Sequence, residues 1–151
     1  AMRMPVSALA LVALTTLAFA DGPRGVVTDP LTKKECSACH MAYAPGFLPA
    51  RSWDALTANL KDHFGEDASL GPEDTAAIRD YLMANAADST GRMRGFARNV
   101  PAGETPLRIS ELPGFKREHG HFSEATMKKV GSLSNCVACH AGAEKGIFED
   151  D

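Results

Sequence analysis

After residue 20 the sequence has no apolar run long enough to span a bilayer, for which about 20 residues are needed, so no stable membrane insertion is expected. It also lacks a strong charge of either sign, since 16 Lys and Arg against 19 Asp and Glu give a net charge of −3. Nucleic-acid-binding domains are usually strongly basic, so no nucleic-acid partner is expected. No segment has clear strand periodicity. The 151 residues therefore predict an all-α protein of one domain or two very small ones.

The first 20 residues form a separate unit. Arg3 supplies a positive start, residues 8–20 (ALALVALTTLAFA) are apolar, and Ala18-Phe19-Ala20 has the small-x-small form of a cleavage site. A transmembrane anchor is the alternative interpretation, but the run is shorter than a membrane span. Residues 1–20 are therefore predicted to be a signal peptide that directs the chain to the periplasm.

All four cysteines lie in two copies of one pattern, Cys36-Ser-Ala-Cys39-His40 and Cys136-Val-Ala-Cys139-His140. Cys-x-x-Cys-His is the signature of covalent c-type haem attachment. Two thiols three positions apart on a helical turn can each add to one haem vinyl group, and the next residue can bind the iron as proximal ligand. The sequence therefore predicts two c-type haems, with His40 on the iron of haem 1 and His140 on the iron of haem 2.

Three other interpretations of the cysteines are weaker. A zinc site would need its two pairs closer together than the 96 residues between Cys39 and Cys136. Thioredoxin-type pairs need no histidine after the second cysteine, and nothing in the sequence indicates a βαβ unit. Disulfides are possible in an exported protein, but cysteines three apart are an unusual choice for them.

Three helices are expected in the N-terminal lobe, residues 21–90. Thr32 and Glu35 have capping-box spacing, which predicts a helix that starts at Thr32 and carries the first haem motif. Ser52 is placed to cap a second helix that runs to about Phe64 and ends at Gly65. One face of this helix would carry Trp53, Leu56, Leu60, His63 and Phe64.

A third helix is expected after Gly71, with Pro72 at its first position. Its buried stripe would comprise Ile78, Tyr81, Leu82 and Asn85. Between the first two helices, residues 41–49 contain two prolines and predict a loop whose apolar side chains pack on a haem face.

Residues 91–114 are rich in Gly, Pro and Arg and predict a linker to a C-terminal lobe, residues 115–151. Its arginines Arg92, Arg94 and Arg98 are either a solvated surface or partners of haem propionates. A short helix over residues 123–130, the second motif and a helical turn over residues 141–145 that ends at Gly146 are expected in the C-terminal lobe. The chain is thus expected to form two small helical lobes, each organised around a haem.

The sixth iron ligand determines whether a haem reacts or only relays electrons. His63 is the predicted distal ligand of haem 1, because an unpaired imidazole on an apolar helix face would be costly and imidazole suits iron. For haem 2 the residues leave His119 and His121 as candidates. The thioether alternatives are Met83, Met93 and Met127. Iron with two histidines has no vacant site and lacks the Met that raises the reduction potential, which favours electron transfer at low potential.

The chain resembles the small dihaem cytochromes c of purple bacteria, the redox partners of the sphaeroides haem protein. Outside the two haem motifs the resemblance rests on Pro45-Gly-Phe-Leu-Pro49, Ser52-Trp53, His63-Phe-Gly-Glu-Asp-Ala-Ser-Leu70, Asn85-Ala-Ala-Asp88, Arg108-Ile-Ser-Glu111, Arg117-Glu-His119 and Ala143-Glu-x-Gly146-x-Phe148. It covers nearly the whole mature chain. The resemblance implies an N-terminal lobe like class I cytochromes c and two bis-histidine haems close together, with His63 and His119 as distal ligands.

The resemblance also implies a membrane b-type cytochrome as electron donor and a soluble monohaem, oxygen-binding cytochrome as acceptor. The expected function is that of a periplasmic electron carrier rather than an enzyme. The alternative is the dihaem electron-transfer subunit of a periplasmic reductase such as nitrate reductase. A peroxidase or a gas sensor is disfavoured, because either needs an iron with an open site.

Overall fold

The computed structural model describes residues 25–148; the predicted signal peptide lies outside these residues. Within them the chain forms helices, loops and turns and no β-strand, so the prediction of an all-α fold is confirmed. The α-helices are α1 (Pro30–Cys36), α2 (Ala50–Ala58), α3 (Pro72–Ala84), α4 (Pro113–His119) and α5 (Glu124–Val130). Short 3-10 helices are η1 (Pro45–Phe47), η2 (Leu60–Asp62), η3 (Gly95–Ala97), η4 (Ile109–Glu111), η5 (Cys136–Ala138) and η6 (Ala143–Lys145). None of the described helices is long and apolar enough to cross a membrane.

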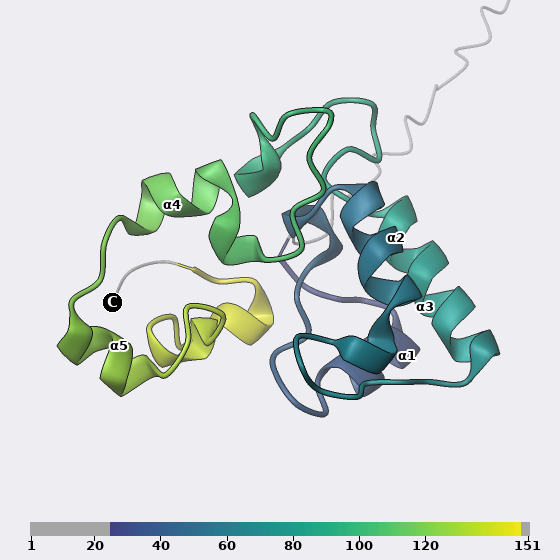
Figure 1. The fold of residues 1–151 in the computed structure, drawn as a ribbon, viewed down its shortest axis with the longest axis horizontal. Helices are drawn as coiled ribbons and strands as arrows, with labels where there is room; N and C mark the ends of the chain where they lie inside the picture. Colours follow the sequence, from purple (N-terminus) through teal and green to yellow (C-terminus); the bar gives the residue numbers. More distant parts are fainter. Residues whose placement is uncertain (1–24, 149–151) are drawn as a thin grey trace, which may run out of the picture.

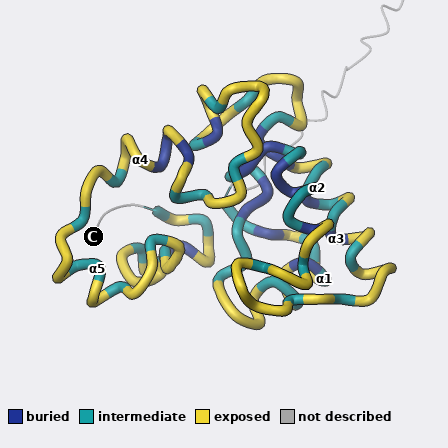
Figure 2. The backbone as a smooth tube through the Cα atoms, viewed as in Figure 1, coloured by how far each residue is buried: buried dark blue, intermediate teal, exposed yellow. Residues whose placement is uncertain are grey.

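Helices α1, α2 and α3 lie together at one end of the molecule, and α4, α5 and the C-terminal turns lie at the other (Figure 1). Buried residues are concentrated around α2 and α3 and in the middle of the molecule (Figure 2). The core combines residues from both ends: Leu48, Trp53, Ile78, Leu82, Ala86, Leu112 and Phe115. The two halves of the chain therefore share one hydrophobic core.

Helix α1 begins two positions before the residue expected to cap it. The Asp29 carboxylate accepts a hydrogen bond of 2.7 Å from the Thr32 N–H, and Pro30 occupies the first helical position. Thr32 itself is inside the helix and buried. The prediction that Thr32 starts the helix was wrong, and α1 ends at Cys36, so most of the first haem motif lies in the turn that follows.

Helix α2 is shorter than expected. Its N-cap is Pro49, Ser52 lies buried within it, and it ends at Ala58 rather than near Phe64. The chain then passes through η2 into a loop closed by the His63 N–H, which donates to the Glu66 carbonyl at 2.8 Å. The prediction of one continuous helix was wrong, because the turn at Asn59 separates the core-facing residues of α2 from His63.

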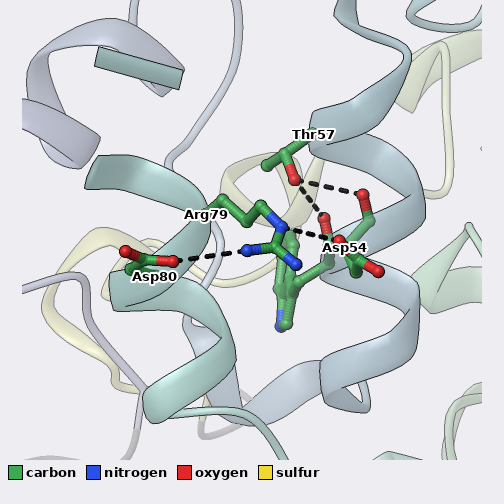
Figure 3. A network of polar contacts seen from close by, with 5 residues as sticks. Asp54, Thr57, Arg79 and Asp80 are labelled. Atoms are coloured by element: carbon green, nitrogen blue, oxygen red, sulfur yellow. Dashed lines mark hydrogen bonds and ion pairs between the residues drawn. The ribbon is translucent and has the colours of Figure 1, made fainter. Parts of the chain in front are cut away.

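Helix α3 confirms the expected start, with Gly71 as N-cap, Pro72 at its first position and acidic side chains in its first turn. Ile78 and Leu82 are buried, whereas Asn85 is exposed, which corrects the predicted stripe at that position. On the outer side Arg79 reaches from α3 to Asp54 of α2, with Nε 2.6 Å from Oδ1, and also approaches Asp80 (Figure 3). These charged side chains are substantially exposed, so the ion pairs contribute little to stability. The association of α2 with α3 therefore depends mainly on the packing of apolar residues between the two helices.

The segment over residues 91–114 packs closely on the rest of the molecule. Ala97 and Leu112 are completely buried. At Gly114 an added Cβ would lie 2.5 Å from the Cα of Phe96, so only glycine permits this approach of α4 to η3. The Arg51 guanidinium also donates to backbone carbonyls of the segment. The segment thus forms part of the shared core, while the lobe boundaries themselves stay a prediction.

In the C-terminal part, α5 follows the expected helix, with Ser123 Oγ accepting from the Thr126 N–H at 3.1 Å. The last helical turn, η6, ends at Gly146 in the left-handed conformation, as expected. Helix α4 was not expected. It begins at Pro113, inside the segment that was interpreted as linker, and its last residue is His119.

Candidate haem-binding sites

Each motif presents one half-buried and one exposed cysteine side chain. Burial raises the pKa of Cys36 and of Cys136, so these groups are held as neutral thiols. A free thiol is the group that adds to a haem vinyl. Both motifs therefore have the chemical form needed for covalent attachment.

In the first site His40 and His63 face each other. Their ring centroids are 6.1 Å apart and their planes differ by 19°. His40 Nδ1 lies 2.7 Å from the Met41 carbonyl oxygen, which can only accept a hydrogen bond, so Nδ1 carries the proton and Nε2 keeps its lone pair. Burial, followed by the charges of His40 and Arg108, lowers the pKa of His63. His63 is therefore neutral, the form that binds a metal.

The second site repeats this arrangement with His119 and His140. Their ring centroids are also 6.1 Å apart, but the planes are nearly perpendicular, at 87°. Here His119 Nδ1 lies 3.0 Å from the Phe115 carbonyl oxygen, one helical turn back in α4, which again leaves Nε2 with the lone pair. Gly120 ends α4 with φ 56° and ψ −138°, a conformation restricted to glycine, and His121 beyond it is exposed.

Both histidine pairs fit one metal between them. A metal–imidazole bond of about 2.0–2.1 Å, with a ring centre about 1.1 Å further on, places the centroids of two opposed imidazoles ~6 Å apart. The observed separation is 6.1 Å in both sites. His63 and His140 each have a buried Nδ1 with no partner in the described structure. The four histidines thus have the separation that two bis-histidine irons require.

The second histidine pair lines a cavity of about 500 Å³. Its volume lies within the range of about 300–1,000 Å³ typical of cofactor pockets. Cys136 and Cys139 also line it, together with five phenylalanines: Phe47, Phe96, Phe115, Phe122 and Phe148. An apolar wall beside two thiols and two imidazoles suits a porphyrin, whose faces are apolar.

Sequence reasoning did not assign Phe47 and Phe96 to this second site. Phe47 lies in the loop after the first motif, and Phe96 lies in the segment interpreted as linker. Phe47 packs at 5.7 Å, between ring centroids, against both Phe96 and Phe148. The apolar character of the 41–49 loop predicted packing on a haem face; the structure places Phe47 of this loop in the wall of the second cavity.

A smaller cavity of about 380 Å³ lies where the two motifs meet. Cys39 and His40 line one side, and Asn135, Cys136 and Val137 line the other. Residues nearly 100 positions apart in the chain are therefore neighbours, and the two attachment sites are adjacent.

Other candidate residues lie elsewhere. Met83 packs against the hydrophobic core. Arg92, Arg94 and Arg98 are exposed, and, among the residues that the structure describes, none of these three lines either cavity. Their role toward propionates stays a prediction.

An all-α fold that presents two Cys-x-x-Cys-His motifs, each opposite a further histidine, defines the class of small c-type cytochromes with more than one haem. The chain belongs to the dihaem cytochrome c family, whose family model, described as "Dihaem cytochrome c", matches residues 32–148. This confirms the resemblance read from the sequence and the prediction of two c-type haems. The search of curated proteins gave no match.

Solved structures agree with this assignment. The chain is 58% identical to a diheme cytochrome c from Rhodobacter sphaeroides, with a TM-score of 0.78, over 82% of this chain and 98% of that one. A second structure, of DHC purified from Rhodobacter sphaeroides, gives 57% identity and a TM-score of 0.70, over 82% of this chain and 99% of that one. A diheme cytochrome type c from Shewanella baltica is 39% identical, with a TM-score of 0.65, over 82% of this chain and 89% of that one.

Proposed function

We propose that the chain is a periplasmic electron carrier, not an enzyme, whose two haems each have two histidine ligands. Haem 1 is attached through Cys36 and Cys39, with His40 and His63 on its iron. Haem 2 is attached through Cys136 and Cys139, with His119 and His140 on its iron. The observation that supports this best is the shared 6.1 Å separation of the two histidine pairs.

The chain's residues act on the haems in two ways. The Nδ1–H of His40 and of His119 donates to a backbone carbonyl, which fixes the tautomer and orients the ring. The five phenylalanines that line the cavity give the second site an apolar wall. The haem iron supplies a one-electron couple, and two imidazole ligands favour a low potential because no thioether is present to raise it.

We further propose that a membrane b-type cytochrome donates the electrons and that a soluble monohaem, oxygen-binding cytochrome accepts them. Charge is divided unevenly along the chain in a way that supports two separate partners. Residues 25–90 carry ten acidic and five basic side chains, a net charge of −5, whereas residues 91–148 carry nine basic and five acidic ones, a net charge of +4. Oppositely charged ends attract partners of opposite sign and keep them from competing for one surface.

The ligand assignment is tested by single replacements in the mature holoprotein. His63→Ala should leave haem 1 attached but five-coordinate, with a high-spin spectrum and new carbon monoxide binding, and His119→Ala should do the same to haem 2. His121→Ala is the matched control and should leave both haems low-spin. His63→Met should stay low-spin with a raised potential.

Carbon monoxide binding to the reduced wild-type protein would contradict the electron-carrier proposal, because it requires an open or readily opened iron site. An unchanged low-spin spectrum in His119→Ala would show that another residue is the ligand of haem 2.

For the partners, stopped-flow electron transfer should slow as salt is raised from low concentration, because salt screens the opposed charges. A rate independent of salt would argue against charge-directed docking.

A further inference from the structure

A tyrosine that belongs to neither haem motif links the segments that carry the two motifs. Tyr43 lies three residues after His40 and lines the cavity where the motifs meet. Its ring stacks on the His40 imidazole, with centroids 4.8 Å apart and planes 17° from parallel. Its hydroxyl donates to the Ser134 carbonyl at 2.6 Å, across 91 residues of chain. One side chain thus contacts a predicted ligand of haem 1 and the backbone that leads into the second motif.

A shift at Ser134 would be transmitted directly to the second motif. Ser134 is held in a tight turn by Ser132, whose Oγ accepts from the Ser134 N–H and contacts the Ser134 Oγ. The next residue, Asn135, receives the Ala138 N–H on its carbonyl, and the Cys136 carbonyl receives the N–H groups of Cys139 and His140. Backbone hydrogen bonds therefore connect the second motif to Asn135, the residue next to the Ser134 carbonyl that accepts from Tyr43.

The hydroxyl of Tyr43 indicates a role beyond packing. Packing against His40 needs only the ring, which phenylalanine would supply equally well. The partner of the hydroxyl is a carbonyl oxygen, which can only accept, so the Tyr43 O–H is the donor. Tyr43 is half-buried, and the partner of its hydroxyl comes from the other end of the chain rather than from a neighbouring turn.

We propose that Tyr43 is a positioning residue that holds the second haem motif against the first and so sets the rate of electron exchange between the two haems. This inference rests on the proposed electron-carrier function. Because electron exchange falls steeply with the gap between centres, a hydrogen bond that fixes this gap acts on the rate even though Tyr43 carries no electron itself.

The test compares Tyr43→Phe with Tyr81→Phe in the mature holoprotein. The sequence has only these two tyrosines. The Tyr81 hydroxyl, in α3, also makes long-range hydrogen bonds, and its partner is Thr28. This contact lies away from both cavities. Each variant therefore loses one phenolic hydroxyl and one tie between distant segments. Amide hydrogen exchange reports the anchoring of the second motif, and two-dimensional NMR exchange between haem-methyl resonances of half-reduced protein reports inter-haem electron exchange.

In Tyr43→Phe we expect the amides of Ala138, Cys139 and His140 to exchange about fivefold faster, the factor that one ordinary hydrogen bond contributes to a local opening equilibrium. Inter-haem electron exchange should slow, while both haems remain low-spin. Tyr81→Phe should change neither quantity. Selective loss of haem 2 from Tyr43→Phe would also support the proposal, because Tyr43 is far from the second motif in sequence.

Unchanged electron exchange in Tyr43→Phe would overturn the proposal, even if amide exchange rises, because Tyr43 would then be structural only. Loss of haem 1 alone would overturn it as well. If Tyr43→Phe retains neither haem, 3-fluorotyrosine can be incorporated at position 43 in a Tyr81→Phe background, which changes the strength of the Tyr43 hydroxyl as a hydrogen-bond donor. A changed rate of inter-haem electron exchange then supports the proposal, and an unchanged rate refutes it. Wild-type protein that binds carbon monoxide, or shows no inter-haem exchange, would instead refute the proposed function.

Discussion

Replacement of Phe47 by alanine tests whether the second haem site depends on the first half of the chain. Phe47 is seven residues after His40, yet it lines the cavity of His119 and His140. It is half-buried, and full burial of a phenylalanine side chain is worth about 1.5–3 kcal/mol. Its ring pairs with Phe96 and Phe148, each at 5.7 Å, add about 0.5–1.5 kcal/mol apiece. Phe47→Ala should therefore lower the free energy of unfolding by about 2–4 kcal/mol.

Thermal unfolding of the holoprotein measures this loss. For a chain of this size about 1 kcal/mol corresponds to ~4 °C, so the midpoint should fall by roughly 8–16 °C. Electron paramagnetic resonance then shows which haem is affected. Low-spin ferric irons with near-parallel and near-perpendicular imidazoles differ in the anisotropy of their signals, and the two histidine pairs differ in this respect, at 19° and 87°. The signal of the perpendicular pair should change.

Phe64→Ala is the matched control. Phe64 adjoins His63, is 44% exposed and carries the Arg108 guanidinium 4.1 Å above its ring. Loss of this exposed cation–π contact should cost only about 0.5–1 kcal/mol. Any spectral change should appear in the signal of the near-parallel pair. If Phe47→Ala instead alters the near-parallel signal and spares the other, the loop after the first motif serves haem 1 and the reasoning is refuted.

Two further predictions concern local packing. Gly114→Ala would place a methyl group 2.5 Å from the Cα of Phe96, so thermal unfolding should show that the free energy of unfolding falls by at least about 1–3 kcal/mol. Gly103→Ala, which has open space around it, is the control and should be neutral or slightly stabilising. Asp29 caps α1 through the Thr32 N–H, which lowers the pKa of its carboxyl in the folded state. The contribution of Asp29 to stability is therefore fully present above the ordinary pKa of Asp and is lost as pH falls through the lowered pKa. Asp29→Asn should flatten the dependence of the unfolding midpoint on pH in this acid range. An unchanged acid dependence would show that the Asp29 cap does not cause it.

The sequence predicted elements best where the signal is local. Pro72 after Gly71, Ser123 before α5 and Gly146 after η6 each act within one helical turn, and the structure has these boundaries where they were expected. Thr32 failed because a better cap, Asp29 with Pro30, precedes it. Ser52 failed because α2 already begins at Ala50, whose N–H donates to the Asp88 carboxylate at 2.8 Å. A capping residue within a helical pattern does not start a helix when the preceding residues already can.

His63 lies opposite His40 for a reason other than the one that the sequence suggested. Helical periodicity placed it on one face with Leu56 and Leu60, but α2 ends at Ala58 and His63 lies in a loop. Its position opposite His40 comes from the turn at η2 and from the hydrogen bonds between His63 and Glu66. The chemical argument for His63, that imidazole suits iron in a protein short of iron ligands, does not depend on the helix, and the ligand role of His63 stays a prediction.

The two histidine pairs and the walls of the second cavity differ in how far apart their residues lie in the sequence. This separation decides which of them could be predicted from the sequence. Each histidine pair comes from one short stretch, His40 with His63 and His119 with His140, so the motifs and the few remaining histidines nominated His40, His140 and His63, while the choice of His119 over His121 came from the family resemblance. The walls of the second cavity come from Phe47, Phe96 and Phe148, which only the folded chain brings together. A fragment limited to residues 115–151 would keep His119, His140 and both cysteines of the second motif but would lack two of these three phenylalanines. The C-terminal lobe therefore contains the chemistry of its haem site, while the N-terminal half of the chain supplies part of the apolar surroundings that this chemistry needs.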